Sequence, residues 1–234
     1  MRQETILELM RLTSDFEVAL KSMEQDSNND VSTSGRSYGG AVRSRKGALH
    51  EALTEDLINI VWKTELQRDA SRLNVNKKKV RIPIRPDYLI RFDEVQHSQM
   101  SAYHFDASVD WHVHVDGKFV LGIECKAFTE NAMIKRILTD FFLLKSSHPE
   151  IDSVLLQLES QLGGDFSTEL DGVGSRSTHT LMSFFPAVNL KVLTLMDGER
   201  SPDKPINKPG FFKSLSKTRL EHAASEFREL LNGY

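Results

Sequence analysis

The chain has 234 residues, which is ample for one domain with a substantial core and short for two. Hydrophobic residues make up 39% of the sequence and charged residues 27%, a balance that excludes disorder throughout the chain. The 30 lysines and arginines are outnumbered by 33 acidic residues, which gives a formal charge of −3. Because no overall basic field exists, any binding to nucleic acid must depend on a local patch.

Cysteine content and hydropathy favour a cytoplasmic protein with no membrane partner. The single cysteine, Cys125, excludes an internal disulfide and a cysteine-cluster zinc site, and it favours a reducing compartment. No apolar run reaches the ~18 residues needed to span a bilayer. The first residues carry an acid and lead into an amphipathic pattern, which is not typical of a signal peptide.

Two helices are predicted near the N-terminus. Apolar residues recur at mostly helical spacing from Glu4 to Met23, which predicts an acidic helix over residues 3–24. A stronger pattern predicts a second helix from Gly47 to Lys63. The segment between them is rich in Ser, Asn and Gly as far as Gly40, which predicts a mobile loop.

This intervening segment, residues 25–46, is interpreted as a flexible basic arm. From Val31 to Leu49 there is no acidic residue. The bland interpretation is a solvated loop, but a basic arm rich in Gly and Ser can also bind a phosphate backbone. Its basic residues are Arg36, Arg43, Arg45 and Lys46.

The remaining pattern alternates strands with helices. Lys77 to Phe92 predicts an edge strand or two short strands, because prolines interrupt it. Phe105 to Ala127 predicts a hairpin around Asp116 and Gly117. The order predicts one α/β domain over residues 1–234, with a mixed sheet and a catalytic core at 47–200. The later elements are a helix from Thr129 to about Lys145, a strand at Ile151–Leu158, a polar loop at Gln161–Ser177, a strand at Asn189–Met196 and a helix at Phe211–Leu231.

The most informative stretch is the second strand of the hairpin. Glu124 and Lys126 stand two residues apart, so both project from one strand face. An acid and an amine side by side on a buried strand are costly unless they have a task. The opposite face is predicted to be core-directed, with Phe119, Leu121, Ile123 and Cys125.

Asp110 on the preceding strand is the third candidate. A hairpin loop of odd length, or a bulge, places Asp110 on the face of Glu124, whereas a two-residue loop places it on the opposite face. If they converge, two carboxylates and a lysine form a site for a hard cation such as Mg²⁺. The cation would polarise a phosphoryl group and lower the pKa of a bound water, and the lysine would orient that water or stabilise developing charge.

Asp110, followed after a spacer by Glu124-Cys125-Lys126 at the end of an apolar strand, resembles the PD-(D/E)XK motif of type II restriction endonucleases. The resemblance implies that Asp110, Glu124 and the carbonyl of Cys125 are metal ligands and that Lys126 positions the attacking water. Glu51, on the second predicted helix, resembles an additional acid of the family. Val109 stands where the motif's name has proline, a residue widely absent from the family.

The resemblance implies a PD-(D/E)XK restriction-endonuclease-like α/β fold and a Mg²⁺-dependent, sequence-specific endonuclease. It further implies a homodimer acting on double-stranded DNA. With no separate DNA-binding module, base readout would come from loops around the core. The expected contacts are Arg176 in the polar loop, as a guanine reader, and Arg36, Arg43 and Arg45 in the arm.

Several alternatives stay open. Asp106 or Asp87 could replace Asp110, and Glu51 could belong to a solvated helix face. The protein could be another nuclease of the superfamily, for repair or RNA, or a non-catalytic nucleic-acid-binding protein. A zinc hydrolase built on His112 and His114 is a weaker alternative, because no third ligand has a diagnostic spacing.

Overall fold

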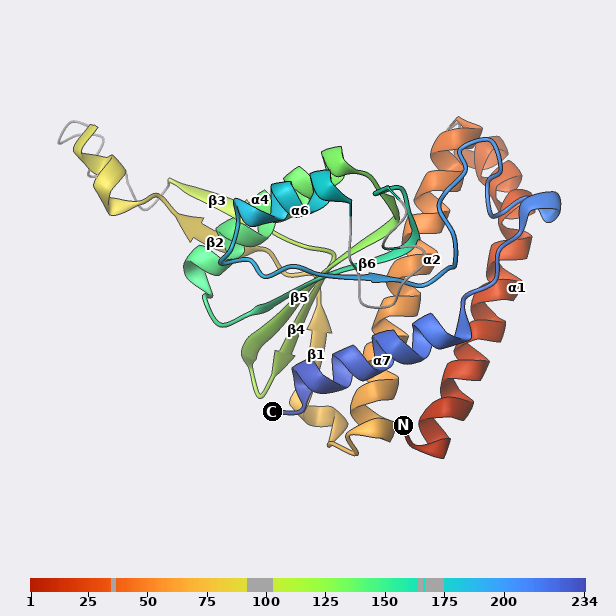
Figure 1. Ribbon diagram of the computed structural model, residues 1–234, viewed down its shortest axis with the longest axis horizontal. Coiled ribbons are helices and arrows are strands. Elements are labelled where there is room, and N and C mark those ends of the chain that lie inside the picture. The colour runs from red at the N-terminus through yellow and green to blue at the C-terminus, as the bar shows by residue number, and fades with distance from the viewer. Residues whose placement is uncertain (35–36, 92–102, 164–165, 167–174) are drawn as a thin grey trace.

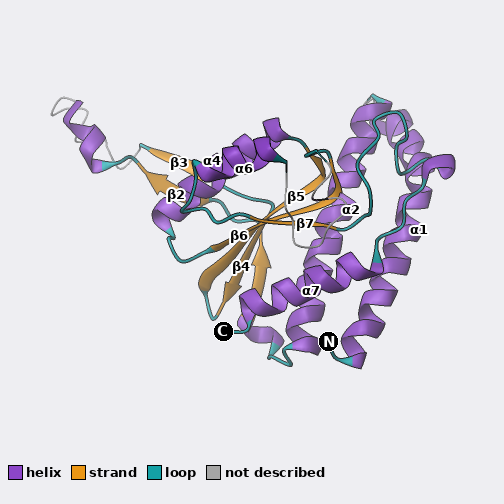
Figure 2. Ribbon diagram, in the orientation of Figure 1, coloured by secondary structure: helices purple, strands orange, loops and turns teal. Residues whose placement is uncertain are grey.

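The computed structural model describes residues 1–34, 37–91, 103–163, 166 and 175–234. A five-stranded sheet of order β1-β4-β5-β6-β7 runs through its centre, with helices on both faces (Figures 1 and 2). The β1, β4 and β5 strands pair antiparallel, whereas β5, β6 and β7 pair parallel. The predicted α/β architecture with a mixed sheet is therefore confirmed. The strands are β1 (Leu73–Asn76), β4 (Trp111–Val115), β5 (Lys118–Thr129), β6 (Asp152–Ser160) and β7 (Lys191–Thr194).

Two hydrophobic cores lie on the two faces of this sheet. One core joins the sheet to α1, α2 and α7, with Leu57, Ile123 and Phe227 fully buried. The other joins the sheet to α4, with Ile134 and Phe141 fully buried. The helices are α1 (Gln3–Ser34), α2 (Tyr38–Ile60), α4 (Asn131–Ser147), α6 (Arg176–Ser183) and α7 (Lys217–Leu231).

The N-terminal helices are longer than predicted. The α1 helix continues to Ser34, and α2 begins at Tyr38 behind an N-cap in which Ser37 Oγ accepts from the amide of Gly40. The interpretation of residues 25–46 as a flexible arm is thus wrong for its described residues other than Ser37, which are helical. The reason is tertiary packing: α1 lies against α2 and completely buries Ser27 and Ala41, which outweighs the weak helix propensity of this segment.

The proline-interrupted segment forms part of a separate two-stranded sheet. The β2 strand (Val80–Pro83) pairs antiparallel with β3 (His104–Ala107), and the short 3₁₀ helix η3 (Pro86–Arg91) follows β2. These elements project from the central sheet (Figure 1). The prediction of a short strand here is confirmed.

Smaller differences concern element ends. The α4 helix begins after Glu130 rather than at Thr129, and α7 begins at Lys217 rather than Phe211. The β1 strand and α6 were not predicted. Short helical segments complete the chain: the π-helical η1 (Val61–Glu65), and the 3₁₀ segments η2 (Ala70–Arg72) and η5 (Pro209–Phe211). Across the described residues, no helix has the length and apolar character to span a membrane.

Candidate active site

The turn between β4 and β5 has two residues, Asp116 and Gly117, with φ of 50° and 80°. Positive φ at both central residues is typical of the tight hairpin turns that match the twist of antiparallel strands. A regular ladder continued from this turn would place Asp110 on the face opposite Glu124, as expected for a two-residue loop.

A β-bulge reverses that outcome. The strand partners change from His114–Phe119 to Val113–Leu121, which leaves Val120 as an extra residue on β5. Beyond the bulge, β4 is shifted by one residue relative to β5, and a shift of one residue exchanges the two faces of a strand. The carboxylate of Asp110, which precedes β4, therefore lies on the same face as Glu124 and Lys126 of β5.

The same bulge corrects the predicted core face of β5. Leu121, Ile123 and Cys125 face the core beneath α2, as expected. Phe119, which lies before the bulge, packs into the core beneath α4 instead. The prediction that all four side chains share one face is wrong for Phe119, because the extra residue changes its parity.

Three oxygen atoms, from β5 and from the residue that precedes β4, converge on the ammonium of Lys126. Its Nζ lies 3.4 Å from Oδ2 of Asp110 and 3.0 Å from the carbonyl oxygen of Cys125, and it forms a short ion pair with Oε1 of Glu124. The amide of Cys125 donates to Oδ2 of Asp110 at 2.8 Å. The structure thus brings together the predicted residues Asp110, Glu124, Cys125 and Lys126.

Burial differs among these groups and sets their electrostatics. The side chain of Glu124 is 11% exposed, against 28% for Asp110 and 30% for Lys126. Burial raises the pKa of Glu124, and the charge of Lys126 opposes this rise. Burial acts to lower the pKa of Lys126, but Glu124 and Asp110 outweigh it and hold the pKa above its usual value. Lys126 is therefore a stable cation in this arrangement.

The thiol of Cys125 points to the other face of the sheet. Its Sγ lies 3.3 Å from Oγ1 of Thr54 on α2, and burial raises its pKa above the usual range. Such a thiol is not a nucleophile. The backbone of Cys125, and not its thiol, contacts the charged cluster: its amide donates to Asp110 and its carbonyl accepts from Lys126.

The charge of Glu51 is among those that raise the pKa of the Cys125 thiol, but its carboxylate is paired outside this cluster. Its carboxylate forms an ion pair with Lys77, whose ammonium also stacks over the ring of Trp111 at 4.5 Å. The backbone oxygen of Glu51 accepts from Nε1 of Trp111 at 3.0 Å. Glu51 therefore stands beside the start of β4, and the structure pairs it with a lysine rather than with the other acids.

The described members of the predicted DNA contacts lie on two helices. Arg43 and Arg45 are exposed on the first half of α2, and Arg176 is exposed as the first residue of α6. Arg36 lies outside the described residues, as does most of the predicted polar loop at 161–177. No hydrogen bond or ion pair joins Arg43, Arg45 or Arg176 to Asp110, Glu124 or Lys126 in the described part of the chain.

The alternatives for Asp110 lie elsewhere. Asp87 is paired with Arg85 at 2.7 Å on the projecting segment, and Asp106 lies 3.6 Å from His104 on β3. In the described part of the chain, no hydrogen bond or ion pair joins either aspartate to Glu124 or Lys126, the acid–lysine pair. Asp110 is thus the candidate whose position agrees with the motif.

The structure gives the zinc interpretation no support. His112 and His114 stack on the ring of Phe119, with ring centroids 4.8 and 5.1 Å away. Nε2 of His112 accepts from the backbone amide of Val109, and Nδ1 of His114 lies 3.1 Å from the side-chain nitrogen Nδ2 of Asn76. Nowhere in the described part of the chain do three or more His, Cys, Asp or Glu side chains gather in a metal-binding arrangement.

Two further polar residues near the cluster were missed by sequence reasoning. Gln157 on β6 is the register partner of Lys126 and is fully buried; it donates to Oγ1 of Thr194 at 2.9 Å. Asp140 on α4 is one of the charges that raise the pKa of Glu124. A polar residue inside the apolar run of β6 was a usable signal, whereas Asp140 looked like an ordinary surface position of a helix.

The chain is 44% identical over 238 residues to the type II restriction enzyme DdeI of Desulfomicrobium norvegicum, and the similarity covers 99% of each chain. Among solved structures, the native BbvCI A2B2 tetramer is similar over 100% of this chain and 98% of that one, with 11% identity and a TM-score of 0.41. No family model matches the sequence. The full-length identity to DdeI shows that the chain belongs to a family of type II restriction enzymes.

Proposed function

We propose that this restriction enzyme hydrolyses phosphodiester bonds of double-stranded DNA at a specific sequence, with Mg²⁺ as its cofactor. The observation that carries the proposal is the convergence of three oxygens, from Asp110, Glu124 and Cys125, on one cationic group. Two carboxylates and a carbonyl are the oxygen ligands that Mg²⁺ prefers. In this structure the same three oxygens surround the ammonium of Lys126, so their arrangement favours a positive charge.

These residues fit a divalent cation, so we assign Asp110, Glu124 and the Cys125 carbonyl as its ligands. When bound there, Mg²⁺ would act as a Lewis acid that neutralises negative charge on the scissile phosphate. Lys126 would have to leave the shared oxygens, and its flexible four-carbon stem allows this movement. The hydrogen bond from the Cys125 amide would keep Asp110 in place.

Lys126 acts in its protonated form in this proposal. Its pKa lies above the usual value despite burial, so it is a hydrogen-bond donor and not a proton acceptor. It orients the attacking water and stabilises negative charge that develops on the phosphoryl oxygens. The water oxygen bonds to phosphorus and releases a proton to solvent. The ester bond to one sugar oxygen breaks, and that oxygen leaves with a proton supplied from solvent.

The same proposal includes a second subunit, the predicted DNA contacts and the additional acid. We propose a homodimer on duplex DNA, so that one active site faces each strand. Arg36, Arg43, Arg45 and Arg176 remain proposed DNA contacts, and the proposal is supported by the exposure of Arg43, Arg45 and Arg176. Glu51 remains a proposed additional acid, supported by its place beside the start of β4 and opposed by its pairing with Lys77.

Digestion of a plasmid of known sequence tests this function. With Mg²⁺ the protein should yield discrete fragments, and chelation of the metal should abolish them. Glu124→Gln should yield no fragments, whereas Glu150→Gln, which changes an exposed acid far along the chain from the motif, should cleave like the wild type. Random degradation would contradict sequence specificity, and full cleavage by Glu124→Gln would contradict the site.

A further inference from the structure

A strongly basic run lies next to the candidate active site and has no role in the reaction described above. Residues 77–85 contain five basic residues and no acid, in a protein whose formal charge is −3. They begin directly after β1 and form β2. We call the described part of this projecting element, residues 77–88 and 103–107, the β2–β3 arm.

The topology places the root of this arm at the active site. The arm is inserted between β1 and β4, which are neighbours in the central sheet and pair Asn76 with His112. Both connections therefore leave the sheet at the same end. After Ala107, the last residue of β3, the chain reaches Asp110 in three residues. The opposite connection begins with Lys77, which is bound to Glu51.

The arm has a buried side and a solvent side. Ile82 and Ala107 are 8% and 2% exposed and pack into the core beneath α4. Because side chains alternate along a strand, Arg81 lies on the other side of β2 from Ile82. Arg81 is exposed, and so is Lys79, which directly precedes the strand. One side of the arm is therefore packed against the body of the protein, and the other side exposes cationic side chains to solvent.

These cations lack counter-ions in the described structure. Lys77 and Arg85 are paired with Glu51 and Asp87. Among the described residues, no carboxylate lies within ion-pair distance of Lys78, Lys79 or Arg81. Asp106 on β3 is the cross-strand partner of Arg81, but its carboxylate lies 3.6 Å from His104 and forms no ion pair with Arg81. The positive charges of Lys78, Lys79 and Arg81 outnumber this one nearby carboxylate, so a bound polyanion would relieve the repulsion among them.

We propose that the β2–β3 arm binds the backbone of the DNA duplex, with Lys78, Lys79 and Arg81 contacting phosphates that flank the scissile one. This inference rests on the proposed function, since it takes DNA as the substrate. A two-stranded ribbon is also narrow enough to lie along the major groove. A second protein chain fits less well, because lysine is depleted in the buried centres of protein interfaces.

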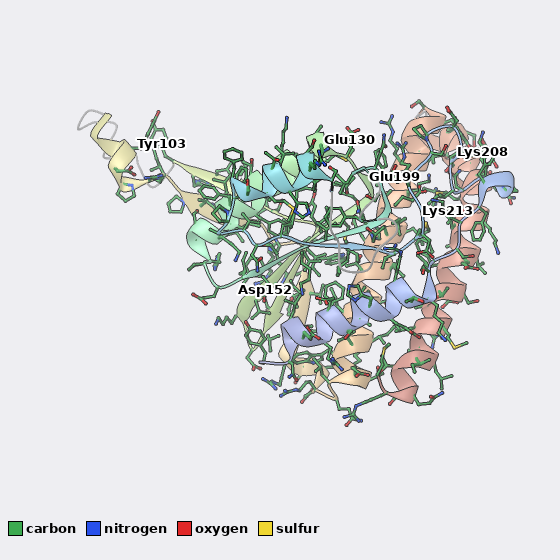
Figure 3. The ribbon with its side chains drawn as sticks, in the orientation of Figure 1. Tyr103, Glu130, Asp152, Glu199, Lys208 and Lys213 are labelled. Atoms are coloured by element: carbon green, nitrogen blue, oxygen red, sulfur yellow. The ribbon has the colours of Figure 1, made fainter. Side chains whose placement is uncertain are left out.

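The test removes two charges from the arm and compares them with two charges elsewhere. Lys79→Ala/Arg81→Ala is the arm variant. Lys204→Ala/Lys208→Ala is the matched control, because both lysines are exposed and Lys208 lies across the molecule from Tyr103 of the arm (Figure 3). Binding to a fluorescent 30-base-pair duplex is measured with chelator present, from low to high salt.

We expect the arm variant to bind more weakly by roughly one to two orders of magnitude at about 0.1 M salt, and its plot of log affinity against log salt to flatten by about 1.8. The control should match the wild type. Lys79→Arg/Arg81→Lys keeps both positive charges and should bind like the wild type, since a phosphate contact depends on charge more than on one side-chain shape.

Unchanged affinity and salt dependence in the folded arm variant would overturn the proposal. So would a loss of self-association in sedimentation without a loss of DNA affinity, because that result assigns the arm to a second chain. Cleavage by the wild type is measured separately. If the duplex binds through the arm but no Mg²⁺-dependent cleavage occurs, the arm stands and the proposed function fails.

Discussion

The amide of Cys125 donates a hydrogen bond of 2.8 Å to Oδ2 of Asp110. This bond ties the residue before β4 to the backbone of β5. The peptide group of Cys125 therefore orients one carboxylate, and the carbonyl of the same residue faces Lys126. Because a backbone donor holds Asp110, its position does not depend on Lys126 remaining in its present place.

Replacing Lys126 should separate chemistry from binding. Lys126→Ala should lower the single-turnover cleavage rate by orders of magnitude while scarcely changing DNA affinity, because its contacts matter mainly in the transition state. Lys126→Arg should not restore the rate, since a broad guanidinium cannot replace a compact ammonium between two carboxylates.

Lys118→Ala is the control for this pair of variants. It changes an exposed lysine at the start of the same strand, and it should cleave normally. If Lys126→Ala kept its cleavage rate, the assignment of the acid–lysine pair to catalysis would be wrong. If it lost affinity instead, and arginine restored that affinity, Lys126 would be a phosphate-binding residue.

Replacing Glu124 should remove metal binding without unfolding the protein. Glu124 is buried beside a cation, and Glu124→Gln keeps its volume while removing a charged ligand. We expect cleavage to fall below detection and DNA affinity to remain within a few-fold of the wild type. Calcium titration followed by tryptophan fluorescence should also show weaker binding than in the wild type, and equal calcium affinity would contradict the ligand assignment.

Glu51 and Lys77 can be tested as a pair. If Glu51 contributes to catalysis, Glu51→Gln should lower the cleavage rate at least tenfold, and Lys77→Ala should not, because it leaves the carboxylate available. If the two residues form only a partly exposed ion pair, both variants should cleave normally and lose less than about 1 kcal/mol of stability. Single-turnover rates and urea denaturation of both variants distinguish these results.

His112 should make the fold sensitive to acid. Burial, with smaller effects of His114 and His148, lowers the pKa of His112 from 6.5 to about 4. Between those values the unfolded chain binds a proton that the folded chain does not, so the free energy of unfolding falls as the pH falls. The loss should approach about 3 kcal/mol, by the usual ~1.4 kcal/mol per pKa unit.

Urea denaturation between pH 7 and 4.5 measures this effect. His112→Phe should be less stable than the wild type at pH 7, because the amide of Val109 loses its acceptor. Its stability should nevertheless fall less steeply with decreasing pH. His222→Phe, at a half-buried position of α7, is the control. An unchanged slope in His112→Phe would show that other groups cause the acid sensitivity.

Replacing two glycines by alanine should change the stability of the protein in opposite directions. A Cβ at Gly122 would stand 2.9 Å from Cε1 of the buried Phe141, so Gly122→Ala should cost about 1–3 kcal/mol. At Gly47, inside α2, a Cβ would meet nothing within 4 Å, and Gly47→Ala should stabilise the protein by about 0.5–1 kcal/mol. Equal effects in chemical denaturation would contradict the packing described here.

The acid–lysine pair could be predicted from sequence because strand alternation is local. Glu124 and Lys126 had to share a face wherever β5 lay, and the apolar run before them indicated a buried strand. The mixed sheet was also predicted, because a tight turn joins two of the strands whereas a helix separates others. These features depend on residues that are near one another in the chain.

Only the tertiary structure decided where Asp110 lies. The sequence allowed either face, and the bulge at Val120 selects the face of Glu124 through the pairing of two strands. Likewise, the packing of α1 on α2 keeps a segment rich in Ser, Asn and Gly helical. The pairing of Glu51 with Lys77 joins residues 26 positions apart. Register, helix packing and such ion pairs arise from contacts between distant segments, and local residue patterns do not determine them.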